Sequence, residues 1–249
     1  MTWPSDLLPS LVGVGVLIVM ATVILWFYRA PHPFSPALAV LRGALQLAVI
    51  SVILTGVIQD PLWVGVALLV MFSVAVLTVS RRVGPTLEHV WMVTASMAAG
   101  IIVTLTIVFA TGAIELSTRY ALAIGGIVIG NSMTIATLAG RRFSESVNEH
   151  WDEVEGWLAL GATPRQSTHE LTRRAVYSAL IPSTDQTKTT GLVTLPGAFV
   201  GAIFGGVSPL EAGRFQIVVL ASLIAAGTIT AVLLISWLAP VRVRPVALK

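Results

Sequence analysis

Seven long apolar stretches limit, more than any other feature, what this chain can fold into. Each can cross the hydrocarbon core of a membrane as a helix, which takes roughly 20 residues. The stretches cover residues 7–28, 37–58, 62–79, 90–111, 120–139, 191–207 and 215–238. Only 11% of the 249 residues are charged, whereas a soluble domain carries about 25%, so a water-soluble fold would lack polar surface. The sequence predicts an all-α, polytopic integral membrane protein with about seven transmembrane helices in a single domain, residues 1–249.

The positively charged residues predict how these helices are oriented. Most of them follow the first, third, fifth and seventh stretches: Arg29, Arg81, Arg82, Arg141, Arg142, Arg165, Arg173, Arg174, Lys188, Arg242, Arg244 and Lys249. The opposite side holds only Arg119 and Arg214. Because cytoplasmic loops are enriched in Lys and Arg, we expect the N-terminus outside and the C-terminus in the cytoplasm. Clustering at helix ends also accounts for the pI near 9.8 without a nucleic-acid partner.

The long polar interruption at residues 141–190 is predicted to be a cytoplasmic helix-break-helix. Its first helix has an apolar face that consists of Val147, Trp151, Val154 and Leu158. Gly161 is expected to end that helix. Thr163 then begins a second helix as its N-cap, with Pro164 at the first helical position, and Pro182 is expected to end it. Such a segment, held between membrane helices, is suited to coupling the chain to a partner in the aqueous phase.

No motif for covalent chemistry is present. The only lysines, Lys188 and Lys249, do not follow a glycine, so the chain has no GxxxxGK[ST] phosphate-binding loop. It has no GxSxG or HExxH motif, no cysteine, and four histidines that do not fall at metal-ligand spacing. The sequence therefore predicts no enzyme activity, no cofactor and no metal site in this chain. The apolar stretches also lack Asp and Glu, the usual proton carriers of transporters, which argues against a proton-coupled carrier.

Two groups of polar residues inside the apolar stretches are candidates for a translocation pathway. Arg42 and Gln46 lie one helical turn apart in the second stretch. One interpretation is that both side chains line a cavity. The other is that the Arg42 side chain extends toward the lipid headgroups. Asn131, Ser132 and Met133 lie near the middle of the fifth stretch. One interpretation is that all three side chains line a substrate path. The other is that Asn131 forms a hydrogen bond between helices.

Small residues predict close helix contacts in the fifth and sixth stretches. Gly126 and Gly130 form a GxxxG pattern, and a broader stripe in the sixth stretch contains Gly197, Gly201 and Gly205 with Ala198, Ala202 and Gly206 beside them. Such faces permit close backbone contact, within one subunit or across a dimer. Pro196 removes a backbone hydrogen bond just before the stripe, which indicates a kink or a broken helix there. The same contact would serve as a moving gate.

Taken together, these segments resemble one family of membrane proteins. The segments are Arg42-x-x-x-Gln46-Leu47, Ile129-Gly130-Asn131-Ser132-Met133, Leu160-Gly161-Ala162, Pro182, Leu195-Pro196-Gly197, Ser208-Pro209 and Phe215-Gln216-Ile217. In this order they resemble the FetB-type iron-export ABC permeases, which include plant aluminium-tolerance relatives. The resemblance implies the membrane subunit of an ATP-driven metal exporter, working as a homodimer in the plasma or bacterial inner membrane. A separate ABC ATPase subunit would then bind ATP and Mg²⁺.

The polar segment is also similar to the Glu-Ala-Ala…Gly coupling loop of many ABC permeases. Glu155 and Gly161 stand at corresponding positions, with Ala162 and Pro164 following, so the resemblance implies that these four residues contact the ATPase. Gly and Trp replace the two alanines after Glu155. After the Pro-Gly of the sixth stretch the family pattern has Met, Thr and Gln, where this chain has Ala198, Phe199, Val200 and Ala202. An ABC permease for another small solute and a stand-alone secondary transporter are the alternatives.

Overall fold

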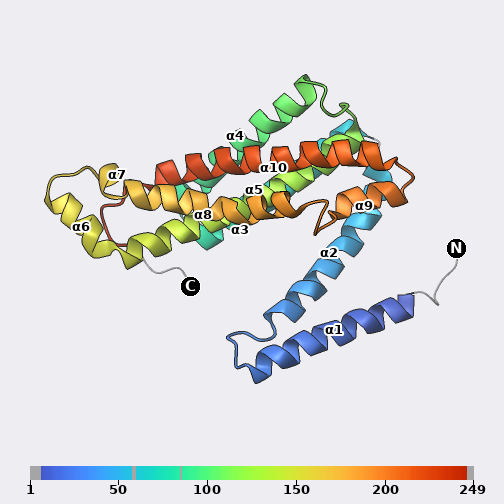
Figure 1. Cartoon of the computed structure of the whole chain (residues 1–249), viewed down its shortest axis with the longest axis horizontal. Helices are drawn as coiled ribbons and strands as arrows, with labels where there is room; N and C mark the ends of the chain where they lie inside the picture. Colours follow the sequence, from blue (N-terminus) through green and yellow to red (C-terminus); the bar gives the residue numbers. More distant parts are fainter. Residues whose placement is uncertain (1–6, 58–59, 85, 246–249) are drawn as a thin grey trace. The chain divides into compact units, whose positions relative to one another are not determined.

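The computed structural model describes residues 7–57, 60–84 and 86–245, which form ten helices (Figure 1). They are α1 (Leu7–Phe27), α2 (Ser35–Val57), α3 (Pro61–Val83), α4 (Leu87–Ala110), α5 (Thr118–Glu149), α6 (Trp151–Ala159), α7 (Pro164–Ser167), α8 (His169–Thr189), α9 (Gly197–Phe204) and α10 (Pro209–Leu238). The chain divides into two compact units. We call them the hairpin unit, which contains α1 and α2, and the bundle unit, which contains α3 to α10.

The hairpin unit consists of two apolar helices packed against each other. The turn between them contains Arg29 and His32, both with positive φ angles of 56° and 57°. Nearly all side chains of α1 are exposed although the helix is strongly apolar. A surface of this kind is stable in lipid or against another apolar surface, but not in water.

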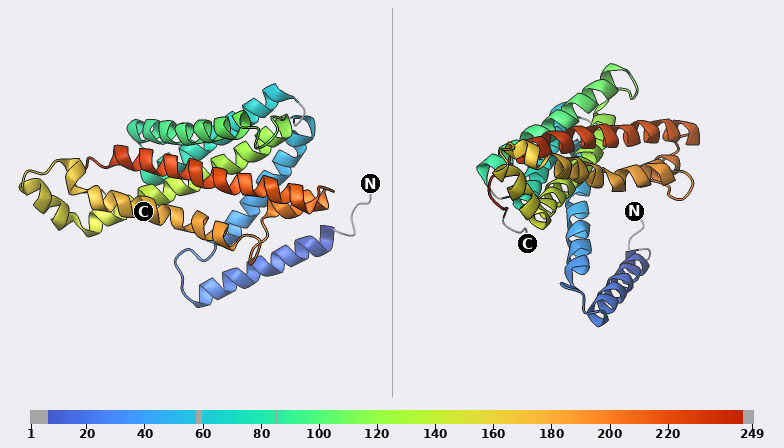
Figure 2. Two further views of the ribbon diagram at one scale, coloured as in Figure 1. Left: turned by 45° about the horizontal axis from the view of Figure 1, so that its top comes forward. Right: turned by 60° about the vertical axis from the view of Figure 1, so that its left-hand side comes forward.

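The bundle unit has its core between α3, α4, α5, α8 and α10. Helix α10 packs against α4, α5 and α8, and α5 also packs against α3. Figures 1 and 2 show α5, α8 and α10 running side by side along the bundle. The helix starts follow from sequence: Asp60 and Ser208 cap helices whose first residue is proline, and Thr86 and Ser117 cap α4 and α5. The core is filled mainly by Val, Ile and Ala.

The prediction of an all-helical membrane protein is confirmed. Helices α1, α3, α4, α5 and α10 are long and apolar enough to cross a membrane, and α2 contains a shorter apolar helix over Ser35–Ser51. The number seven and the orientation stay predictions.

The expected span over residues 191–207 is wrong as a single helix. The only helix in that range is α9, with eight residues, which gives a length of about 12 Å. Gly191 has a φ of +88°, and the backbone amides of Val193 and Thr194 turn back to the carbonyl of Thr189. Pro196 is extended and begins α9. The broken helix that Pro196 suggested therefore replaces the span.

The expected end of a helix at Pro182 is also wrong. Helix α8 continues through Pro182 to Thr189. Proline removes one backbone hydrogen bond, but Ala175 and Ala179 are buried in the same apolar cluster as side chains of α5 and α10. The packing of α8 against α5 and α10 keeps the helix continuous, although the low helix propensity of proline alone would end it.

Candidate functional site

The elbow, residues 150–168, connects α5 to α8 and holds the predicted coupling residues. The predicted break is confirmed: Gly161 follows α6 with a φ of +88°, a conformation that favours glycine. The predicted second start is confirmed as well, although the helix that begins there, α7, ends at Ser167 and α8 begins anew at His169. Thr163 and Gln166 form a complete capping box, in which the Thr163 amide donates to Gln166 Oε1 at 2.8 Å. The turn between α6 and α7 is therefore rigidly defined.

The apolar face of α6 is already used inside the chain. Val154 is buried with Val147 of α5 and Leu171 of α8 in one cluster. The face that remains free carries Trp157 and Leu160, which are 51% and 83% exposed. A partner would therefore contact α6 around Trp157 and Leu160, beside the apolar face that the sequence pattern indicates.

An open groove lies along this free face. It has a volume of about 710 Å³ and is lined by Trp157, Leu160, Gly161, Ala162, Arg165, Gln166 and His169. Gly161 and Ala162 of the predicted coupling set line it, Pro164 is half-buried beside it, and Glu155 is exposed on α6 without lining the groove. The groove combines exposed apolar side chains with the positive charge of Arg165, so it suits an apolar partner segment with acidic residues at its edge.

The elbow is attached directly to the bundle. The hydroxyl of Thr168, which is fully buried, donates to the carbonyl of Ala239 at 2.7 Å, just beyond the end of α10. Arg244 donates to the carbonyl of Asn148 at the other end of the elbow. A force applied to the groove would therefore reach α8 and α10 through hydrogen bonds and packed side chains.

Asn131 connects three helices in the middle of the bundle. Its Nδ2 donates to the Leu223 carbonyl of α10 at 3.0 Å, and its Oδ1 accepts from the Ser183 hydroxyl of α8 at 3.1 Å. Ser132, in contrast, is fully buried with an Oγ that has no partner among the described residues, and Met133 packs against the apolar core. The three neighbours therefore have different surroundings within the described part of the chain, and their part in a translocation pathway stays a prediction.

We expect Asn131→Ala to lower the free energy of unfolding by about 1–2 kcal/mol, because two hydrogen bonds between membrane helices are lost. Ser183→Ala removes one of them, so adding it to Asn131→Ala should have little further effect. A double-mutant cycle of chemical unfolding in detergent measures this coupling. Thr134→Ala is the control, since the Thr134 hydroxyl donates to a carbonyl of its own helix, that of Gly130. Additive losses for Asn131 and Ser183 would contradict the bridge.

Arg42 and Gln46 lie on α2 in the hairpin unit, and both side chains are exposed there. Their placement is described for that unit alone, so their part in a pathway stays a prediction.

The predicted glycine contacts are only partly present within the described part of the chain. A Cβ at Gly126 would meet Met71 of α3 at 3.1 Å, whereas Gly130, Gly197 and Gly201 have no atom within 4 Å of an added Cβ. At Gly205 an added Cβ would meet only carbonyls of α9 itself. A close approach to another helix's backbone lies elsewhere, at Gly100 of α4, where a Cβ would stand 2.5 Å from the Ala226 carbonyl.

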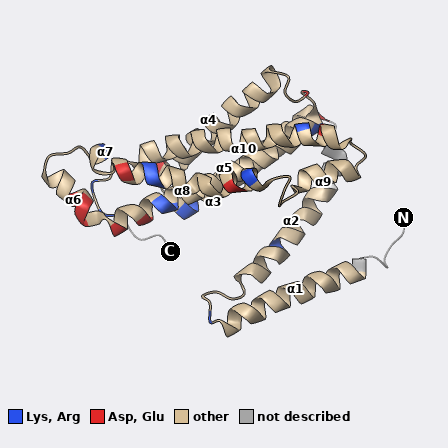
Figure 3. Ribbon diagram, viewed as in Figure 1, with Lys and Arg blue, Asp and Glu red and all other residues tan. Residues whose placement is uncertain are grey.

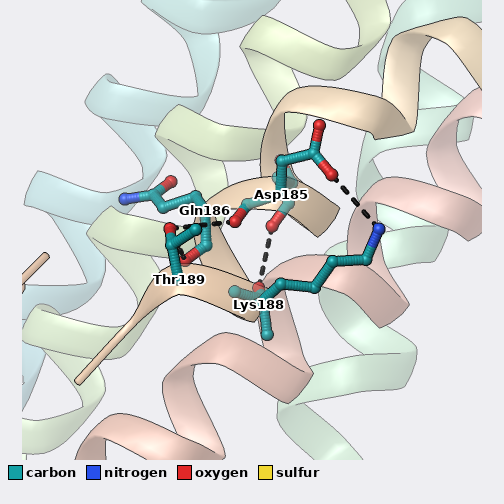
Figure 4. A network of polar contacts seen from close by, with 6 residues as sticks. Asp185, Gln186, Lys188 and Thr189 are labelled. Carbon is teal, nitrogen blue, oxygen red and sulfur yellow. Dashed lines mark hydrogen bonds and ion pairs between the residues drawn. The ribbon is translucent and has the colours of Figure 1, made fainter. Parts of the chain in front are cut away.

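Sequence reasoning also missed the charged end of α8. Asp185 and Lys188 form an ion pair of 3.2 Å on one side of the helix, while Gln186 points to another side (Figure 4). Figure 3 shows the charges of the bundle unit mostly toward its two ends. The signal in the sequence was that every residue from 183 to 190 is polar, which made the segment look like an aqueous loop.

Comparisons with known proteins agree with the resemblance found in the sequence. The family described as "Uncharacterised protein family (UPF0014)" matches residues 8–241. The chain is 36% identical to the "UPF0014 membrane protein STAR2" of rice, over 89% of this chain and 79% of that protein. It is 32% identical to "Protein ALUMINUM SENSITIVE 3" of Arabidopsis thaliana, over 87% and 80%. It is 33% identical to the "Probable iron export permease protein FetB" of Escherichia coli, over 55% and 53%. No solved structure matches.

Proposed function

The chain belongs to the UPF0014 family, and we propose that it is the membrane-spanning subunit of an ATP-binding cassette transporter that exports a metal ion such as iron. A separate ATPase subunit would bind ATP and Mg²⁺ and hydrolyse the nucleotide. The names of two relatives, one an iron export permease and one linked to aluminium sensitivity, support a metal cargo.

The groove of the elbow carries this proposal. It is an exposed, partly apolar surface at an end of the bundle that carries many Lys and Arg residues, and the elbow that forms it is hydrogen-bonded through Thr168 to Ala239, just beyond α10. Exposed apolar patches of this kind mark interaction sites. Dimerisation of the ATPase on binding nucleotide would pull on the elbow and tilt α8 and α10 around the pathway.

A second copy of the chain would complete the transporter in the plasma or bacterial inner membrane. The small-residue stripe of α9 supports this part of the proposal. No atom of the described part of the chain lies within 4 Å of a Cβ added at Gly197 or Gly201. A stripe without side chains is suited to close contact between two membrane helices.

The proposal is tested by expressing the chain together with the products of its neighbouring genes, any P-loop ATPase among them, and purifying it through a tag on this chain. We expect the ATPase to copurify and its hydrolysis rate to rise in the complex. Recovery of this chain alone, with no ATPase retained under mild detergent, would count against an ABC permease.

The stand-alone secondary transporter is the second candidate, and one observation favours it. The sequence argument against it was the absence of membrane carboxylates, but Asp185 lies beside the apolar part of α5. Transport by the purified chain in liposomes, driven by an ion gradient without ATP, would establish this alternative.

A further inference from the structure

Helix α8 runs antiparallel to α5 at the depth of the membrane interior. Ser183 bonds to Asn131, and Asn131 lies about 16 Å and 12 Å from the two ends of the apolar stretch 120–139 at 1.5 Å per residue. Ala175 and Ala179 are buried with Ile135 and Ala139 of α5 further along the same contact. The end of α8 beyond Ser183 therefore lies beside apolar residues of α5, and not in the cytoplasmic layer.

Continuing this register places the ion pair well inside the apolar layer. Asp185 comes to about the depth of Ile129, and Lys188 to about the depth of Gly126, still some 9 Å from Tyr120. Neither residue is covered by the described part of the chain: their side chains are 60% and 69% exposed. A charge facing lipid at such a depth is costly, so membrane charges face water-filled cavities or other protein groups.

Three threonine hydroxyls at the end of α8 are satisfied within the helix itself. Thr187 donates to the Ser183 carbonyl at 2.8 Å, Thr189 donates to the Asp185 carbonyl at 3.0 Å, and Thr190 donates to the Gln186 carbonyl at 2.8 Å. These bonds allow a polar sequence to remain helical away from water. The charged atoms of Asp185 and Lys188, in contrast, are directed away from the helix (Figure 4).

Two features make the local field favour a cation. Asp185 lies in the last part of α8, and the C-terminal end of a helix carries partial negative charge. The helix then breaks at residues 190–196 before α9 begins, and transporters hold cations at such interrupted helix ends. Lys188 occupies this field as the internal counterion.

Building on the proposed function, we propose that Asp185 is the cation-binding residue of the translocation pathway, which follows the exposed face of α8, and that the entering metal ion displaces Lys188. The donor that the site offers is the carboxylate oxygen of Asp185, and oxygen donors of this kind suit hard divalent cations. A single carboxylate per chain gives weak binding, as a pathway requires, because the ion must also leave.

Direct binding tests the site without the ATPase. Purified chain is titrated with Mn²⁺ or Fe²⁺ by calorimetry, and Asp185→Asn is expected to weaken binding by roughly tenfold or more. Lys188→Gln should bind as well as the wild type or more tightly, because it removes the competing cation. Glu170→Gln is the matched control, since Glu170 forms a 3.1 Å ion pair with Arg174 on the same helix and is equally exposed, at 60%. Unchanged binding by Asp185→Asn, or a wild type that binds neither metal, would overturn the proposal.

The exchanged pair Asp185→Lys with Lys188→Asp separates a metal site from a structural ion pair. In the reconstituted complex, the exchange should restore folding and basal ATP hydrolysis but not stimulation by metal. Full recovery of metal-stimulated ATP hydrolysis would show that the ion pair has only a structural role, and it would overturn the proposal. Loss of activity in Lys188→Gln alone, with Asp185→Asn active, would indicate an anionic substrate and would overturn the assignment. If no ATPase joins the complex, the proposed function fails while the binding experiment still decides the role of Asp185.

Discussion

Gly100→Ala is expected to destabilise the bundle strongly, because it places a methyl group against the backbone of a neighbouring helix. The new Cβ would lie 2.5 Å from the carbonyl oxygen of Ala226 and 2.6 Å from the hydroxyl of Thr230. A backbone carbonyl in the middle of α10 cannot rotate away, so α4 and α10 must separate. Such overpacking costs about 1–3 kcal/mol, or roughly 2–12 °C in the unfolding temperature of a chain of this size. Thermal unfolding in detergent measures the change.

The control is Gly65→Ala on α3. An added Cβ at Gly65 has no atom of the described chain within 4 Å, and alanine is a better helix former than glycine by about 1 kcal/mol. This variant should therefore unfold at the wild-type temperature or slightly above it. If Gly100→Ala behaved like Gly65→Ala, the close contact between α4 and α10 would be disproved.

The contrast between Gly100 and the predicted glycine patterns explains part of what sequence can and cannot reveal. A GxxxG spacing shows that two small residues share a helix face, but not whether another helix lies on that face. Gly126 meets α3, while Gly130 meets nothing within the described part of the chain. Gly100 stands alone in its stretch and has no such spacing, so only the packing of α4 against α10 identifies it.

The long apolar helices were predictable because hydrophobic length alone decides whether a segment can cross a membrane. Local capping was also predictable, as Thr163 and Gly161 illustrate, because it depends on residues only a few positions apart. Helix α8 was not predictable in the same way. Its continuation through Pro182 depends on α5 and α10, which lie far away in the sequence.

The candidate site shows the same division. Asn131 was identified because an amide in an apolar stretch is conspicuous, but its partners Ser183 and Leu223 could not be read from the sequence. Asp185 was assigned to the cytoplasm because its neighbours are polar, and only the Ser183–Asn131 bond gives its depth. Polar residues in the membrane escape sequence analysis when a second helix, rather than their own, supplies the apolar surroundings.

Gly161→Val is expected to reduce coupling between the chain and the proposed ATPase partner by about tenfold. Gly161 has a φ of +88°, and a β-branched residue held there stores about 1–3 kcal/mol of strain. The turn would relax, and the groove formed by Trp157, Leu160 and Gly161 would change shape. Because 1.4 kcal/mol corresponds to a factor of ten in affinity, the amount of copurified ATPase and its stimulated hydrolysis should fall together.

Two further variants separate this effect from general misfolding. Gly161→Asn should keep most of the coupling, because asparagine tolerates positive φ better than other residues with a side chain. Leu160→Glu leaves the backbone unchanged and replaces a side chain that is 83% exposed, so it should preserve the unfolding temperature while weakening ATPase binding. If Leu160→Glu and Gly161→Val both bound the ATPase normally, the groove could not be the coupling surface. If Leu160→Glu alone failed to bind, the chemistry of the groove, and not the angle of the turn, would determine recognition. The elbow would then act first as a binding surface, and it would transmit movement to α8 and α10 only after the ATPase is bound.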